Sequence, residues 1–229
     1  MRYEDDFKTF DKAKDTGIGD FVILTRRPNE KKISEILNRM DIHNKGLQSM
    51  KADVMMVIHN IQLNVSDTFT GNVSYLPKNN KHSMYARVNW VKPVEEQIVQ
   101  IGEDYELYRP RLNQVIRGTI KKIPSGGALD FMHMTKEQLK ASYSIAYIGE
   151  DQLSGNIQTW HLEITPKTTT TYKTAEAWVD SDGMPRQVKV NEQDGDSTSV
   201  LLSNIQKNVT LNAEIFKLKY PSTVKRIKA

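Results

Sequence analysis

The first periodic stretch of hydrophobic residues in the chain is helical. Apolar side chains recur at intervals of three and four residues, at Ile33, Ile36, Leu37 and Met40. This spacing places them on one face of a helix, for which Asn29 is a suitable N-cap and Gly46 a suitable end. Residues 1–28 show no sustained period, so we expect an N-terminal extension over 1–28 and one domain over 29–229.

From Ser49 onwards the hydrophobic period changes from helical to alternating, which is typical of strands with one buried face. Stretches of this kind cover 52–58, 68–75, 84–90, 96–101, 104–109, 113–121, 142–149, 156–165, 172–180, 185–192 and 197–206. About eleven short strands, with turn signals every ~8–12 residues, predict a mainly β (α+β) fold. We expect a single, strongly curved antiparallel sheet that forms an open barrel.

Two turns within this series are well marked. Trp178-Val179-Asp180 ends a strand, Asp182-Gly183 supplies residues that tolerate tight-turn geometry, and Pro185 opens the next strand. Asp194-Gly195 is a second hairpin signal of the same type. These turns fit a sheet built largely from hairpins.

A second helical segment is predicted over residues 128–141. Its apolar residues are Phe131, Met132, Met134 and Leu139. Thr135 is suited to cap the helix, and Gln138 completes a capping box three residues later. Two amphipathic helices of this size suit a cover for the concave face of the sheet. A loose cover would leave a ligand cavity and a tight one a dry core. Both remain open, since both need the same residue types.

Composition and charge narrow the classes of partner. The 229 residues are 38% hydrophobic with a mean hydropathy of −0.56, and 32 basic against 28 acidic residues give a net charge of +4. No basic stripe with interleaved aromatic residues occurs, so we expect no nucleic-acid partner. Basic residues do gather near the end of the chain, at Lys217, Lys219, Lys225, Arg226 and Lys228. Such a cluster suits either a solvated terminus or attraction to anionic headgroups or an acidic partner.

Catalytic and metal-binding chemistry has no sequence support. The chain has no cysteine, which excludes disulfides, Cys-based zinc sites and a lipidation cysteine. The five histidines are scattered, Asp180-Ser181-Asp182-Gly183 lacks the later ligands of a calcium loop, and no serine lies in Gly-x-Ser-x-Gly. We therefore expect no catalytic residues, no metal and no cofactor. No run reaches the ~18 apolar residues of a membrane span, and residues 1–6 do not form a signal peptide. We expect a soluble protein whose export signal, if it has one, has been removed or lies upstream.

Several short motifs occur in an order that is characteristic of one family. They are 37–40 with 47–52, Gly71 to Tyr75, Gly102 to Tyr105, Tyr108-Arg109-Pro110, Gln114-Val115, Phe131-Met132 with Leu139 and Tyr143, Trp178 to Pro185, Phe216 and Pro221. In this order, over nearly 200 positions, the chain resembles the bacterial outer-membrane lipoprotein carrier (LolA-like) family. The arginine that this family places before a proline after its second strand has no counterpart in Leu76-Pro77-Lys78-Asn79.

The resemblance implies an open, unclosed β-barrel with helices as a lid, and a cavity that holds the acyl chains of a lipoprotein as it crosses the periplasm. It implies a lipidated protein or lipid as ligand, an inner-membrane release complex and an outer-membrane acceptor as partners, no catalysis, and a monomer. The expected cavity residues are Val54, Met56, Val73, Tyr75, Met84, Val88, Trp90, Trp160 and Leu162, and the expected lid residues are Ile36, Met40, Phe131, Met132 and Leu139. The alternative is an envelope lipid-sensing or protein-interaction domain on the same fold.

Overall fold

The computed structural model describes residues 28–79, 83–119 and 134–229 of the chain. Its strands are β1 (Met50–Asn60), β2 (Val65–Leu76), β3 (Tyr85–Lys92), β4 (Glu96–Ile101), β5 (Asp104–Arg109), β6 (Gln114–Thr119), β7 (Tyr143–Leu153), β8 (Ile157–Pro166), β9 (Tyr172–Asp180), β10 (Pro185–Glu192), β11 (Ser197–Lys207) and β12 (Lys225–Lys228). Two α-helices, α1 (Pro28–Gly46) and α2 (Lys136–Ser142), and two short 3-10 helices, η1 (Pro110–Leu112) and η4 (Ala213–Phe216), complete the described elements.

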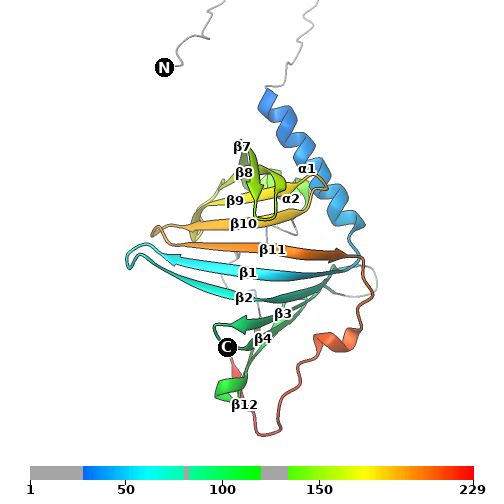
Figure 1. Cartoon of the computed structure of the whole chain (residues 1–229), viewed down its shortest axis with the longest axis vertical. Coiled ribbons are helices and arrows are strands. Elements are labelled where there is room, and N and C mark those ends of the chain that lie inside the picture. Colours follow the sequence, from blue (N-terminus) through cyan, green and yellow to red (C-terminus); the bar gives the residue numbers. More distant parts are fainter. Residues whose placement is uncertain (1–27, 80–82, 120–133) are drawn as a thin grey trace, which may run out of the picture.

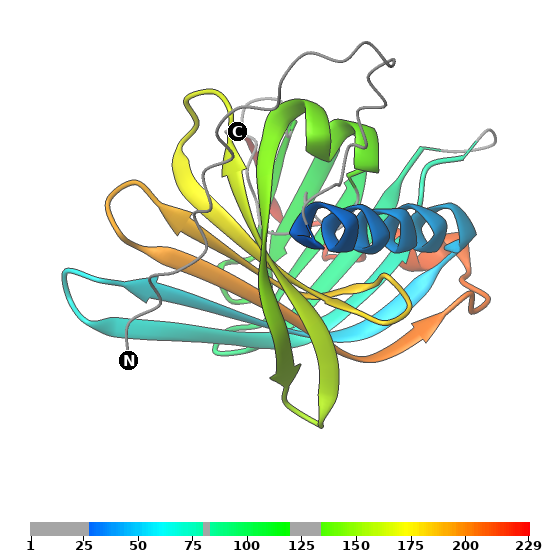
Figure 2. The same ribbon diagram turned by 90° about the horizontal axis from the view of Figure 1, so that it is seen from above.

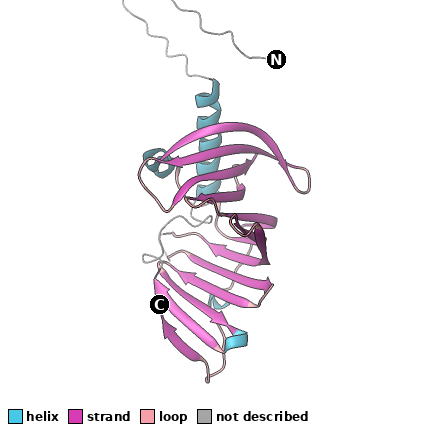
Figure 3. Ribbon diagram, turned by 90° about the vertical axis from the view of Figure 1, so that its left-hand side faces the viewer, coloured by secondary structure: helices cyan, strands magenta, loops and turns pink. Residues whose placement is uncertain are grey.

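The described strands form one sheet in the order β12-β6-β5-β4-β3-β2-β1-β11-β10-β9-β8-β7. Neighbouring strands are antiparallel, except that β12 runs parallel to β6. The order ends at β12 and β7, so the described sheet curves without closing (Figures 1 and 3). The predicted fold class, a mainly β open curved sheet with helices, is confirmed. Strand β12 was not predicted, because four residues are too few to show an alternating pattern.

The helices lie against the concave side of the sheet (Figure 2). On α1, the predicted apolar face is buried, with Ile36 0%, Leu37 1% and Met40 3% exposed. Helix α2 begins at Lys136, and its N-cap is the predicted capping box: the Thr135 side chain accepts from the Gln138 backbone N–H, and the Gln138 side chain accepts from the Thr135 N–H. The remainder of the predicted helical segment, including Phe131 and Met132, lies outside the described residues, as does the predicted extension apart from Pro28.

The turn between β9 and β10 is packed directly on α1. The Asp180 carboxylate accepts from the backbone N–H groups of Asp182 and Met184, both at 2.9 Å, and from Arg186 Nε at 2.5 Å. Gly183 has φ +84°, and a Cβ there would lie 2.3 Å from the backbone carbonyl of Arg39. The predicted turn is confirmed, and the structure adds its role, which is to seat the helix on the sheet.

The segment after β11 crosses the outer face of the sheet (Figure 1). Phe216 is 2% exposed and packs against Tyr85, with 5.4 Å between ring centroids. Val224 joins Tyr108 and Val115 in a small second core, against which Tyr220 packs. The chain then returns as β12 along the edge of β6. The basic residues Lys225, Arg226 and Lys228 therefore lie on a strand, where their side chains are exposed.

Candidate functional site

The structure places the described members of the predicted cavity and lid in one hydrophobic cluster. Eight of them are buried there, namely Val54, Val73, Tyr75, Val88, Leu162, Ile36, Met40 and Leu139. The partly buried members that pack against this cluster are Met56, Met84, Trp90 and Trp160. Phe131 and Met132 lie outside the described residues. The alternation of the sequence thus identified one continuous face of the sheet.

This inner face has a sealed half. On β8, β9 and β10, inward side chains near the helices have almost no contact with solvent: Leu162 and Ala177 are 1% exposed, and Val188 is 0%. The two helices complete this packing through Leu37 and Leu139, which are both 1% exposed. A ligand in contact with Leu162 therefore requires α1 to move away from the sheet.

The other half of the inner face is more open. Register pairs join Val88 to Ile98, Ile98 to Leu107 and Leu107 to Ile116, so one row of apolar residues crosses β3, β4, β5 and β6. Val88 is buried in the core, whereas Ile98, Leu107 and Ile116 are half-buried. The sequence prediction missed these three residues. Their alternate positions in three predicted strands were the available signal, but only the register shows that they continue the row from Val88.

Polar and aromatic groups border the apolar surface. Trp90 contacts Phe69 edge to face, with 5.9 Å between ring centroids. Glu96 lies opposite Trp90 in the register, and its Oε1 is 3.0 Å from Arg109 Nε. Burial raises the pKa of Tyr75 to about 12, so its hydroxyl stays neutral at physiological pH. The interior presents an apolar surface with charge confined to its border.

Helix α1 is held to the sheet by contacts that differ from its apolar packing. Lys32 Nζ and Arg39 Cζ lie 4.5 and 5.2 Å from the centroid of the Trp160 ring, within the range of cation–π contacts. Arg39 Nη1 also donates to the backbone carbonyl of Ser181 at 2.9 Å. Polar contacts of this kind are individually weak at exposed sites.

Comparison with protein families identifies the fold. The family model described as outer membrane lipoprotein carrier protein LolA matches residues 79–219, which is more than half of the chain. The chain belongs to the LolA family. Members of this superfamily are generally carriers without catalysis. No curated protein sequence matches this LolA-family chain.

Solved structures share the LolA fold with this chain at low identity. An uncharacterised conserved protein from Thermus thermophilus is 15% identical, with a TM-score of 0.57 over 86% of this chain and 99% of that one. MucB is 14% identical, with a TM-score of 0.55 over 82% of this chain and 63% of that one. The MucA/MucB complex of Pseudomonas aeruginosa matches at 12% identity, with a TM-score of 0.50 over 82% of this chain and 61% of that one. At these identities the likeness concerns the fold alone.

Two further observations concern the described part of the LolA-family chain. No three histidine, aspartate or glutamate side chains come together there as metal ligands would. None of its helices combines the length and the apolar character needed to cross a bilayer.

The outer face carries a polar hollow of about 860 Å³ between β1–β4 and the segment around η4. Side-chain amides and charged groups line it, and Arg87 donates to Asn89 Oδ1 at 2.7 Å and to Gln97 Oε1 at 2.9 Å. Arg87 Nη1 also donates to the carbonyl of Ile215 at 2.6 Å, which fixes the C-terminal segment to the sheet. The guanidinium group of Arg87 thus donates its hydrogen bonds to other residues of the protein.

Proposed function

We propose that this LolA-family chain is a non-catalytic periplasmic carrier that binds the acyl chains of lipoproteins, or related lipids, on its concave face and carries them toward the outer membrane. The observation that carries the proposal is the half-buried row of Ile98, Leu107 and Ile116, which extends the core without being sealed by the helices. Each acyl methylene that such a surface removes from water contributes roughly 0.8 kcal/mol. An acyl ligand needs no other chemistry.

The proposed cavity combines this row with the residues predicted from the sequence. Met56 and Met84 lie at the border of the core, where flexible thioether side chains adapt to ligands of irregular shape. Helix α1 acts as the lid, since its buried Ile36 and Met40 cover the sealed half. Displacement of α1 would join the two halves into one longer apolar surface.

We assign the handover of ligand to one rim of the sheet. The turns that join β1 to β2, β3 to β4 and β5 to β6 lie at the same end, because these strands run antiparallel in sequence order (Figure 1). Large apolar side chains are exposed there, with Ile61 53%, Leu63 73% and Leu112 64% exposed. Exposed aliphatic groups at an open end suit contact with an inner-membrane release complex and an outer-membrane acceptor.

The test is binding of a fluorescent acyl probe to folded variants. Leu107→Asp and Met84→Asp each place a charge on the inner face, which the acyl chain of the probe would avoid. If two methylenes of the probe lose their contact with this face, binding becomes roughly tenfold weaker. Val91→Asp is the control. Val91 follows the inward Trp90 on β3, so it lies on the outer face, and it is 53% exposed. Unchanged affinity in both inner-face variants would contradict the proposal.

A second function has one observation in its favour. MucB, which shares the fold, has a structure in complex with MucA, so this architecture accommodates a protein partner. A protein-interaction role in the envelope predicts that the wild-type chain fails to bind the acyl probe. The same titration therefore separates the two functions.

A further inference from the structure

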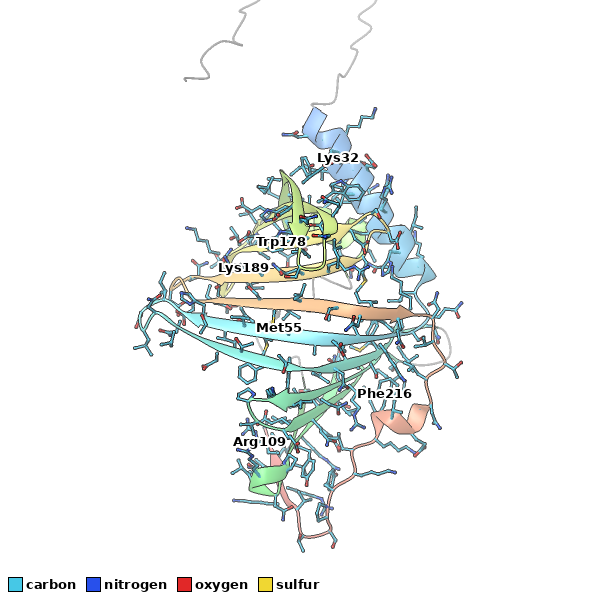
Figure 4. All side chains as sticks on the ribbon, in the orientation of Figure 1. Lys32, Met55, Arg109, Trp178, Lys189 and Phe216 are labelled. Carbon is cyan, nitrogen blue, oxygen red and sulfur yellow. The ribbon has the colours of Figure 1, made fainter. Side chains whose placement is uncertain are left out.

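A second hollow, of about 1030 Å³, lies on the outer face beside the C-terminal segment. Val99 and Ile101 of β4 form part of its lining, and Phe216 and Leu218 line it from the C-terminal segment (Figure 4 labels Phe216). Side chains alternate along β4, so Val99 faces outward while its neighbour Ile98 belongs to the inner face. This hollow is therefore separate from the proposed carrier cavity.

The hollow is preformed by a fixed segment of chain. Arg87 and Asn113 donate to the carbonyls of Ile215 and Thr223, at 2.6 and 3.2 Å, on either side of the part that lines the hollow. Arg117 Nη2 donates to the Tyr220 hydroxyl at 2.9 Å. Because these contacts hold the segment in place without a ligand, little ordering is needed on binding. The volume lies near the upper end of the range found for small-molecule sites.

Four cations surround the apolar part, and two of them are uncompensated. Arg117 pairs with Glu106 at 2.6 Å and Lys217 with Glu214 at 2.7 Å. In the described ranges, Arg226 and Lys228 of β12 have no ion pair or hydrogen bond from their side chains, and Asp104 is the one further acidic side chain in the lining. The parallel register sets Arg226 beside Val115 and Lys228 beside Arg117, so both project onto the outer face.

We propose that this outer hollow binds an anionic single-chain amphiphile. Its carboxylate or phosphate group lies between Arg226 and Lys228, and its hydrocarbon chain covers Ile101 and Leu218. Charge complementarity selects the anionic head, because two cations with no acidic partner gain charge-assisted hydrogen bonds there. The apolar lining selects a chain, since Ile101 is 42% exposed and its burial is favourable. A nucleic acid or an acidic peptide would leave this lining unused.

The test uses isoleucine methyl NMR, with dodecanoate below its micelle concentration as the probe. Ile101 reports on the outer hollow and Ile98, three positions earlier on the opposite face, reports on the carrier cavity. We expect a saturable shift of the Ile101 methyl signal with dodecanoate. We expect three control compounds to bind at least about tenfold more weakly than dodecanoate. Acetate and inorganic phosphate supply the anionic head alone. Dodecyl maltoside supplies the hydrocarbon chain with an uncharged head.

Matched charge variants complete the experiment. R226Q/K228Q removes the two uncompensated cations from the hollow and is expected to weaken dodecanoate binding at least about tenfold. K219Q/K225Q removes the same net charge from residues that do not line the hollow, and is expected to bind as the wild type does. If R226Q/K228Q failed to fold, Leu218→Asp would test the apolar side of the site instead, with the Ile101 methyl still present as the reporter.

Three results would overturn the proposal. They are a saturable shift at Ile98 with none at Ile101, equal affinity for dodecyl maltoside, and equal weakening by the two charge variants. The first of these would leave the carrier function intact, because it would place the acyl chain on the concave face. Unchanged acyl-probe affinity in Leu107→Asp and Met84→Asp would contradict the carrier function. That outcome would leave the Ile101 result, and the proposal for the outer hollow, unaffected.

Discussion

His43 lies near the end of α1, where the helix meets the sheet. The side chain is 9% exposed, and its Nε2 has no hydrogen-bond partner within the described residues. Burial lowers the pKa of His43, and Lys207, whose Nζ is 3.4 Å from Nδ1, lowers this pKa further, while Asp180 and Asp182 oppose the shift. The neutral imidazole is therefore the form that the native packing of α1 favours.

The lowered pKa of His43 predicts a loss of stability in acid. Above the unfolded-state pKa of about 6.5 the residue is neutral in both states, and its full contribution to stability is present. As the pH falls from there toward the lower folded-state pKa, the unfolded chain takes up a proton that the native chain does not, so the free energy of unfolding decreases. We expect His43→Gln to reduce this decrease below about pH 6.5, as measured by urea unfolding at several pH values. A pH dependence identical to that of the wild type would contradict the account.

Among the elements, the β9–β10 turn shows what local sequence can and cannot predict. Asp182-Gly183 was predicted to form a turn, because those residue types tolerate its backbone angles. That the turn packs on α1 was not predictable, since Arg39 and Gly183 are far apart in the sequence. Strand alternation likewise identified the inner face. The difference between its sealed and open halves depends on which strands the helices cover, which no local pattern encodes.

Gly183→Ala should loosen the contact between this turn and α1. Alanine at φ +84° is strained, and its Cβ would also lie 2.3 Å from the Arg39 carbonyl carbon. Gly155→Ala is the matched control, because Gly155 has φ +82° with nothing within 4 Å of the added Cβ. We expect Gly183→Ala to reduce the free energy of unfolding by about 1–3 kcal/mol more than Gly155→Ala does. Equal effects in urea titrations would mean that backbone strain alone explains the cost and that the turn can shift away from α1.

At the scale of the whole molecule, the two faces of one curved sheet differ in chemical character. The inner face continues the core into a half-buried apolar row, whereas the outer face is crossed by the C-terminal segment and carries the uncompensated cations. Only the inner face could be predicted from periodicity. The outer arrangement depends on the parallel pairing of β12 with the edge of β6, between segments more than a hundred residues apart in the sequence. The segment Lys225–Lys228 is too short for its sequence pattern to predict this pairing.

Removal of β12 should make the molecule self-associate. The strand covers the edge of β6, with backbone hydrogen bonds from Lys225 to Asn113 at 2.9 Å and from Ala229 to Arg117 at 2.8 Å flanking the pairing. A chain ending at Val224 keeps the small core of Tyr108 and Val115 but leaves that edge unpaired, and an unpaired edge is a template for another copy. We expect concentration-dependent dimers or larger species in sedimentation experiments. R226Q/K228Q is the control, because it loses the same two cations of the hollow while keeping the strand. Association of that variant to the same extent would assign the effect to lost charge repulsion, whereas its staying at the mass of the wild type would assign it to the exposed edge.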